Sequence, residues 1–315
     1  MSSNPQPAHR DKEDPLVTIG LVTLNEEKVI AGSLGALIDE SRHINSEIVV
    51  VAGGTDRTID IVSDSLLRAK KSKLLLDSTP RGKPAALNWL VRESRGEILV
   101  LSDGDVTIRK GSIRGLVDTF SDDGVGCATG KVIGAGSAYN TVQKICDATA
   151  EAMDLSRYEQ YLRTGSVSLA SGYIIAVRRS LMPIIPEDTN SDDGYISAYV
   201  RSKGFRIAYV ESAIVEIKFP RTLSDYIKQK SRTRYGHLQV RRQFREEDAR
   251  SPLNDLKDFA RNFVGGSGRK HRAYISVLAL ILTGFVWIVA MLRMRVPWLF
   301  RRHVWEAVKS TKVDL

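Results

Sequence analysis

Two aspartates separated by one glycine stand near the end of an apolar segment in the first third of the chain. Asp103, Gly104 and Asp105 follow residues 97–101, which are typical of a buried strand. Side chains two residues apart at the end of a strand can point into one cleft, where a divalent cation would offset the repulsion between their carboxylates. Asp-Gly is also common in turns. The triplet therefore indicates a metal site only in the company of other polar motifs.

Such motifs occur in order along the chain. They are Asn25-Glu26 after an early strand-like segment, Gly82-Lys83 at the start of a predicted helix, Asp192-Asp193 further on, and Gln229, Arg232 and Gly236 in a basic segment. Carboxylates can hold a divalent cation or accept a proton, and Lys and Arg can neutralise phosphate. The set predicts chemistry on a phosphate-bearing ligand.

The elements that position these motifs alternate between strands and helices from about residue 16 to 210. The first half has predicted strands at 17–23, 47–51, 73–77 and 97–101 and predicted helices at 26–37, 57–67 and 84–95. Strands separated by about a dozen helical residues predict right-handed βαβ units, and so an α/β fold with a mostly parallel, Rossmann-like sheet flanked by helices. Ligands of such sheets bind at the carboxyl ends of the strands, where residues 23–26, 52–56 and 102–105 fall.

The second half is less regular. It has predicted strands at 127–133, 167–177 and 206–210 and predicted helices at 141–162 and 192–203. From residue 219 to 250 the chain is basic, with aromatic and aliphatic residues between the charges. That pattern suits a helix lying against anionic lipid headgroups.

Residues 273–292 form a stretch of 20 residues without a charge. As a helix it would span roughly 30 Å, the thickness of a bilayer core. A buried core helix is the alternative, but the stretch lacks an amphipathic pattern, which favours a transmembrane helix. The predicted organisation is a disordered N-terminus at 1–15, a catalytic domain at 16–218, a basic juxtamembrane helical region at 219–272, the membrane helix at 273–292 and a basic tail at 293–315.

The net charge of +9 predicts an anionic partner: a phosphate-bearing ligand, an acidic lipid or a nucleic acid. No nucleic-acid-binding motif supports the last of these, and the basic juxtamembrane stretch explains the charge, so we expect no nucleic-acid partner. The two cysteines, Cys127 and Cys146, lack metal-ligand spacing and are expected to be buried thiols. The five histidines give no metal set, and His237 is expected to be exposed.

The motifs, taken in order, resemble those of the family 2 glycosyltransferases, inverting enzymes of the GT-A fold. The resemblance covers about residues 16–239. It rests on Thr23-Leu24-Asn25-Glu26, residues 53–58, Arg81-Gly82-Lys83 with the following residues to Asn88, Asp103-Gly104-Asp105, Ser191-Asp192-Asp193, and Gln229-Lys230-Ser231-Arg232-Thr233. It implies a nucleotide-sugar donor, linked to UDP or GDP, and a lipid-linked or glycan acceptor.

The resemblance also implies a role for each motif. Donor binding would fall to Thr23, Asn25, Glu26, Lys83, Asp103, Gln229 and Arg232. Asp105, with Asp103, would ligate Mg²⁺ or Mn²⁺, and Asp193 would be the general base that takes a proton from an acceptor hydroxyl. Gly172 and Asp192 would lie on the acceptor side. The alternatives are a solvated helix-start lysine at Lys83 and simple helix-start acids at Asp192 and Asp193.

Two departures from the family pattern limit what the resemblance implies. Val51 and Ala52 stand where many members have two aspartates, one of which contacts the nucleotide base, so the choice between UDP and GDP stays open. Thr233 replaces a tryptophan that helps polymer-forming members bind the acceptor. That replacement, together with the single membrane segment, predicts transfer of one sugar. The alternatives are transfer to a polyprenyl phosphate and a non-catalytic, degenerate GT-A partner subunit.

Orientation follows from two expectations. The chain shows no export signal, and nucleotide sugars are made in the cytoplasm, so the catalytic domain is expected on the cytoplasmic face of the cell membrane. The basic tail would oppose the positive-inside tendency if it crossed. A re-entrant tail, with residues 297–308 returning along the surface, is therefore an alternative prediction.

Overall fold

The structure is a computed structural model that describes residues 16–136, 140–245, 251–255, 257 and 270–296. The predicted disordered N-terminus at 1–15 lies outside the described residues. So do the proposed return of residues 297–308, the rest of the tail to 315 and most of the linker before residue 270. The predicted domain boundaries stay predictions.

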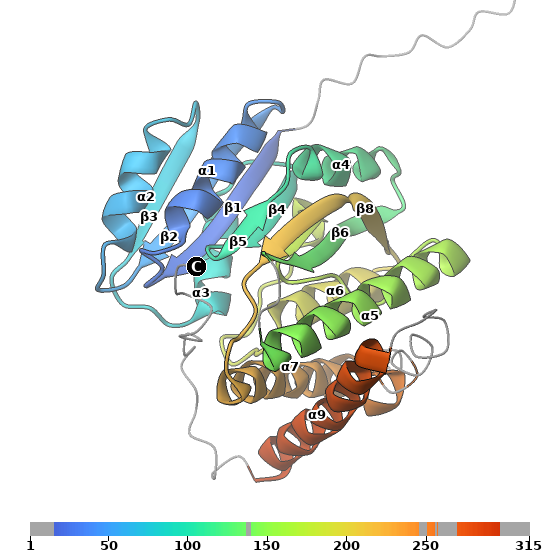
Figure 1. Cartoon of the computed structure of the whole chain (residues 1–315). Coiled ribbons are helices and arrows are strands. Elements are labelled where there is room, and N and C mark those ends of the chain that lie inside the picture. The colour runs from blue at the N-terminus through green and yellow to red at the C-terminus, as the bar shows by residue number, and fades with distance from the viewer. Residues whose placement is uncertain (1–15, 137–139, 246–250, 256, 258–269, 297–315) are drawn as a thin grey trace, which may run out of the picture.

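A single eight-stranded sheet forms the centre of the molecule, in the order β3-β2-β1-β4-β7-β6-β8-β5 (Figure 1). The strands are β1 Val17–Leu24, β2 Ser46–Gly53, β3 Ser72–Asp77, β4 Ile98–Asp103, β5 Val106–Ile108, β6 Val125–Gly134, β7 Ile174–Arg178 and β8 Arg206–Ile217. Strands β3, β2, β1 and β4 are parallel, as predicted. The other half is mixed, because β7 runs antiparallel to both β4 and β6, and β5 antiparallel to β8, while β6 and β8 are parallel.

Helices cover both faces of this sheet. They are α1 Ile30–Ser41, α2 Thr58–Leu66, α3 Lys83–Glu93, α4 Ser112–Asp118, α5 Thr141–Thr164, α6 Asp192–Ser202, α7 Leu223–Phe244 and α9 Lys270–Arg295, with the short 3₁₀ helices η1 Thr119–Ser121 and η2 Arg179–Leu181. Buried side chains of α1, α2, α4 and α5 share one core with the sheet, whereas those of α3 and α6 form a second core on the other face. The α/β fold with flanking helices is thus confirmed.

Several predicted boundaries shift where side chains make long-range contacts. Helix α1 begins at Ile30 instead of residue 26. Glu26 lies in the turn before the helix, and its amide donates a hydrogen bond to Oγ1 of Thr58, the first residue of α2 (2.6 Å). Strand β7 begins only at Ile174; the predicted strand at 167–173 is wrong apart from an isolated bridge between Ser171 and Ile174. Strand β8 runs on to Ile217, because β6 and β5 pair with its far end.

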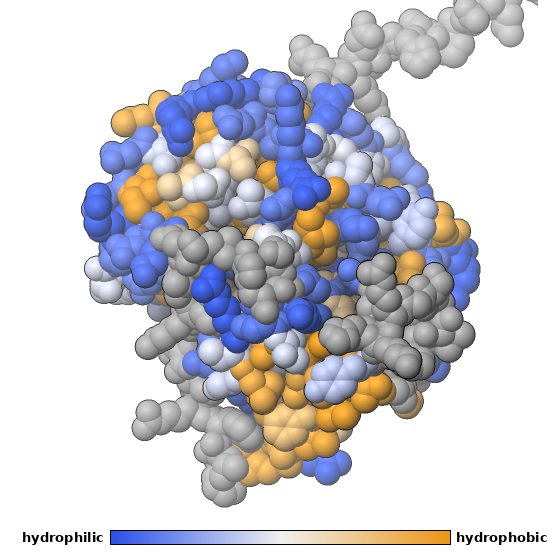
Figure 2. Space-filling view, in the orientation of Figure 1, coloured by the Kyte–Doolittle hydropathy of each residue, from blue (hydrophilic) through white to orange (hydrophobic). Residues whose placement is uncertain are grey.

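Helix α9 contains the predicted membrane segment. Its residues Tyr274–Arg295 are long and apolar enough to cross a membrane, and a window of 18 residues within them has a mean hydropathy of 2.6. One side packs on α5 and α7 and buries Ala279, Val286 and Trp287. The opposite side exposes apolar side chains, among them Ile281, Phe285 and Ile288, which Figure 2 shows as an apolar patch at the lower edge of the molecule. An exposed apolar face of this size argues against a plain core helix.

Candidate active site

The predicted site residues converge on one cleft of about 250 Å³. It lies at the carboxyl ends of β1 and β4 and is bounded by the first residues of α3 and α6 and by one face of α7. Of the eleven residues predicted to form the site, all but two line this cleft: Glu26, Lys83, Asp103, Asp105, Gly172, Asp192, Asp193, Gln229 and Arg232. The two exceptions are Thr23 and Asn25. Segments remote in sequence are thus brought together at the edge of the sheet where ligands of parallel strands usually bind.

Lys83 joins two of the acidic motifs. Its Nζ lies 2.7 Å from Asp103 Oδ1 at the end of β4 and 2.9 Å from Asp192 Oδ2 at the start of α6. Only 13% of the lysine side chain is exposed. The alternative of a solvated helix-start lysine is therefore wrong. Asp192 is more than a helix-start acid, since it is one of the two anions that hold this ammonium.

The electrostatics of the cleft follow from this crowding. Burial, together with the carboxylates of Asp105 and Asp192, raises the pKa of Asp103 to about 6, even though Lys83 acts in the opposite direction. Burial alone would lower the pKa of Lys83, but the carboxylates of Asp103 and Asp192 raise it above its ordinary value. Lys83 therefore stays charged and holds two of the carboxylates of the cleft.

Glu26 lies against Asp103-Gly104-Asp105 and is held there by Thr23, which does not itself line the cleft. Thr23 Oγ1 donates to Glu26 Oε2 (2.9 Å), and both residues are buried. Asn25 has a left-handed backbone (φ 55°), and its Oδ1 accepts from the Thr55 amide (2.8 Å). Gly104 allows this close approach, since a Cβ at this position would meet both Glu26 Oε2 and the side chain of Thr23.

Asp193 has a carboxylate fixed by three donors. Oδ2 accepts from the Gly172 amide (3.1 Å), and Oδ1 accepts from Ser191 Oγ (2.6 Å) and the Gly194 amide (2.8 Å). The amide of Gly172, which itself lines the cleft, thus helps to orient Asp193. A carboxylate held in this way keeps a fixed direction, and two oxygens with three donors retain a lone pair that can accept a further proton or hydrogen bond.

His237 is a site residue that sequence reasoning missed. It was expected to be exposed on a basic helix, but it is 4% exposed, and its Nδ1 lies 3.4 Å from Ser191 Oγ. The reason is the preceding Gly236. A Cβ there would approach the backbone of Asn190 and Ser191 to 2.6 Å, so glycine allows α7 to touch the start of α6. The glycine one position before the histidine is the signal that could have shown this close approach.

Helix α7 contacts both the cleft and the interior of the protein. Gln229, Lys230, Arg232 and Thr233 line the cleft, so this basic helix forms part of the candidate site. Arg234 points into the protein and pairs with Asp255 (2.8 Å), and both side chains are 5% exposed or less. From α9, Trp287 donates its Nε1–H to the same carboxylate (2.8 Å), and its ring lies 5.4 Å from the guanidinium carbon.

The metal-ligating side chains of the cleft suit a divalent cation that takes its remaining ligands from a bound nucleotide and water. Within the described part of the chain, no cluster of three or more His, Cys, Asp or Glu side chains is placed to hold a metal ion. Asp103 and Asp105 supply two carboxylates. Mg²⁺ in nucleotide sites commonly takes one or two carboxylates and completes its shell with phosphate oxygens and water.

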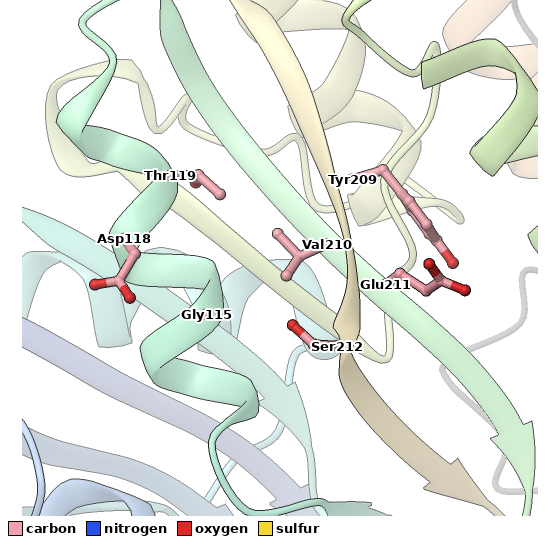
Figure 3. Close-up of a pocket in the computed structure, with 7 residues that line it drawn as sticks. All are labelled: Gly115, Asp118, Thr119, Tyr209, Val210, Glu211 and Ser212. Carbon is pink, nitrogen blue, oxygen red and sulfur yellow. The ribbon is translucent and has the colours of Figure 1, made fainter. Parts of the chain in front are cut away.

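A second hollow, of about 720 Å³, lies between α4 and β8. Figure 3 shows Val210 and Ser212 pointing toward α4, whereas Tyr209 and Glu211 point to the other side of the strand. It is a shallow depression, and its Asp118 already pairs with Arg114 (2.7 Å). It offers no counterpart to the convergent charges of the cleft.

Comparison with known proteins identifies the family. Residues 15–236 match the family described as glycosyltransferase like family 2. The chain belongs to glycosyltransferase family 2. Among curated relatives, a probable glycosyltransferase, YdaM, of Bacillus subtilis is 24% identical over 238 residues, and an N-acetylglucosaminyltransferase of Rhizobium leguminosarum bv. viciae is 23% identical over 243 residues. These alignments cover 73% and 72% of this chain but only 57% of either relative, so the chain spans little more than half of their length.

Solved structures show that this family 2 chain has the GT-A fold. A mannosyltransferase from Pyrobaculum calidifontis, in complex with GDP-Man and Mn²⁺, superposes with a TM-score of 0.63 at 19% identity, covering 92% of this chain and 90% of that one. Glucosyl-3-phosphoglycerate synthase from Mycobacterium tuberculosis, in complex with Mg²⁺ and UDP, gives 0.52 at 16% identity, covering 72% and 79%.

Proposed function

We propose that this protein is an inverting glycosyltransferase that moves one sugar from a nucleotide-sugar donor to a hydroxyl of a lipid-linked or cell-surface glycan. The observation that carries the proposal is the convergence of Asp103, Asp105 and Asp193 with Lys83 and Arg232 in one cleft. A degenerate scaffold would have no use for all of these charges together. Family membership supports the same reaction class.

The donor diphosphate would lie beside Asp103 and Asp105, with Lys83 and Arg232 supplying positive charge. Loss of the nucleoside diphosphate leaves growing negative charge on its phosphate oxygens, which fixed cations stabilise. Asp103 and Asp105 would hold Mg²⁺ or Mn²⁺, which acts as a Lewis acid on the diphosphate when bound. Val51 and Ala52 are buried in β2 and offer no carboxylate to a nucleotide base, so either UDP or GDP could be the carrier.

Asp193 would act as the general base. Attack by an acceptor hydroxyl on the anomeric carbon requires loss of its proton, and direct displacement inverts that carbon. The three hydrogen bonds to the carboxylate fix its direction. A lipid phosphate is already a nucleophile and needs no base, so a carboxylate held in this manner favours a hydroxyl acceptor.

Helix α9 would anchor the enzyme in the membrane with the cleft on the cytoplasmic face. Its exposed apolar side suits lipid, and α7 links it directly to the cleft. A lipid-linked acceptor could then reach the site without leaving the bilayer.

The test is nucleoside-diphosphate release by the detergent-solubilised full chain across UDP- and GDP-sugars, with and without Mn²⁺ or Mg²⁺. We expect metal-dependent release with one donor and its loss in Asp105→Ala. Product analysis separates the acceptors: a glycosidic bond to a hydroxyl supports the proposal, whereas a lipid phosphodiester would assign a polyprenyl-phosphate acceptor. Failure both to turn over and to bind any donor would favour a non-catalytic partner subunit.

A further inference from the structure

The place of Lys83 is unusual for a cation. It is the first residue of α3, at the positive end of the helix dipole, where lysine is disfavoured. The cost is offset by ion pairs to Asp103 and Asp192, which come from two other elements. One ammonium group thus connects the start of α3, the end of β4 and the start of α6.

The same ammonium contacts a carboxylate that the proposed function assigns to the metal. Lys83 Nζ is 2.7 Å from Asp103 Oδ1, and Asp103 lies in the electrostatic reach of Asp105. A divalent cation held by Asp103 and Asp105 would therefore be placed close to a fixed positive charge. Like charges a few ångströms apart repel strongly in a partly buried site.

A diphosphate removes this conflict. Its oxygens can accept hydrogen bonds from the ammonium and also ligate the cation, so both positive charges gain a shared anionic partner. Lys83 has a flexible four-carbon stem and can change partner without moving the helix.

We propose that Lys83 is a built-in counter-ion of the donor-site carboxylates, which releases Asp103 only when metal and nucleoside diphosphate arrive together. This inference rests on the proposed function. It makes metal binding cooperative with nucleotide binding: the lysine weakens binding of the metal alone and strengthens binding of the metal–diphosphate pair. A coupling of this kind typically changes affinity by about 5- to 150-fold.

The experiment measures binding of Mn²⁺ to the full chain in detergent by titration calorimetry, with and without UDP or GDP. In the wild type we expect weak binding of Mn²⁺ alone and much tighter binding when the nucleotide is present. In Lys83→Met, Mn²⁺ alone should bind at least about tenfold more tightly, and the gain on adding nucleotide should shrink. Lys83→Gln retains a hydrogen-bond donor for Asp103 without the charge, and it should behave in the same way if the methionine variant folds poorly.

The matched control is Lys73→Met. Lys73 forms a single ion pair with Glu93 away from the cleft, so its loss should leave Mn²⁺ binding unchanged. Unchanged or weaker binding of Mn²⁺ alone in both Lys83 variants, with the Mn²⁺–nucleotide complex still formed by the wild type, would overturn this inference and leave the proposed function intact. A wild-type protein that binds neither UDP nor GDP in the presence of Mn²⁺ would overturn both.

Discussion

At the scale of single residues, Asp193 and Asp103 are two carboxylates in one cleft with different surroundings. Asp193→Asn keeps the shape of the side chain but removes the proton acceptor. We expect kcat to fall by about 100- to 10,000-fold while affinity for the nucleoside diphosphate stays unchanged. Asp64→Asn, an exposed position on α2, is the control and should match the wild type. A loss of nucleotide affinity equal to the loss of rate would show that Asp193 serves binding and not proton transfer.

Asp103 predicts a pH effect on stability. Its folded pKa of about 6 lies above the ordinary 3.8, so the folded protein keeps a proton that the unfolded chain loses between these values. This carboxyl therefore stabilises the fold fully below about pH 4, and the contribution, on the order of 3 kcal/mol, is lost as the pH rises through about 6. Without metal or nucleotide, the wild type should lose more thermal stability from pH 4.5 to 7 than Asp103→Asn. Parallel pH profiles would contradict this assignment.

At the scale of elements, close packing of α7 on the start of α6 brings Ser191 and His237 together. Gly236→Ala would push the two backbones apart, because the nearest atoms to the new Cβ belong to the main chain of Asn190 and Ser191. We expect a loss of about 1–3 kcal/mol in unfolding free energy and reduced transfer activity. Gly32→Ala is the matched control, because a Cβ there meets nothing within 4 Å and should stabilise helix α1 slightly. Equal stabilities of the two variants would rule out tight packing at Gly236.

The second element-scale contact joins α7 to the apolar helix α9 through Arg234, Asp255 and Trp287. Asp255→Ala would leave the Arg234 charge buried without its carboxylate, which costs about 3–5 kcal/mol. We expect a lower melting temperature and weaker nucleotide binding, since α7 carries Gln229 and Arg232. The control is Asp122→Ala, which breaks the exposed ion pair between Asp122 and Arg206. It should lower the free energy of unfolding by no more than about 1 kcal/mol. A small effect of Asp255→Ala would mean that the α7–α9 contact is held by apolar packing alone.

At the scale of the whole molecule, labelling of the two native cysteines reports on folding. Because the folded protein should label slowly, a cysteine introduced elsewhere can be labelled selectively to test membrane topology. Both are buried, and burial raises the pKa of Cys146 to about 11. About one thiol in a thousand would be ionised there at pH 8. Maleimide should therefore label the native protein slowly and label both cysteines after denaturation. Rapid labelling of the native chain would show that the catalytic domain opens.

That background permits a test of the membrane arrangement. In Ser310→Cys, a position outside the described residues, labelling from outside intact cells would show that α9 crosses the membrane and would eliminate the re-entrant form. Labelling only after the cells are opened would support a tail on the same side as the catalytic domain. The same variant labelled in detergent controls for access of the reagent.

Much of the molecule is determined locally by the sequence. Alternating strands and helices predicted the parallel half of the sheet, since strand and helix periodicity depend on neighbours in the chain. The charge-free stretch predicted the apolar helix α9, because its composition is a property of one segment. Of the residues that the ordered motifs assigned to the site, all but Thr23 and Asn25 line the cleft, because strand ends and helix starts meet at one edge of a parallel sheet.

Only the tertiary structure decided which charges face one another. The pairing of Lys83 with both Asp103 and Asp192 depends on three elements that meet in space, so no local pattern contains it. The burial of His237 depends on how closely α7 approaches α6, and the antiparallel direction of β7 depends on its partners β4 and β6. Local propensity fixes what a segment becomes, whereas long-range packing fixes its neighbours, and the chemistry of this cleft is set by those neighbours.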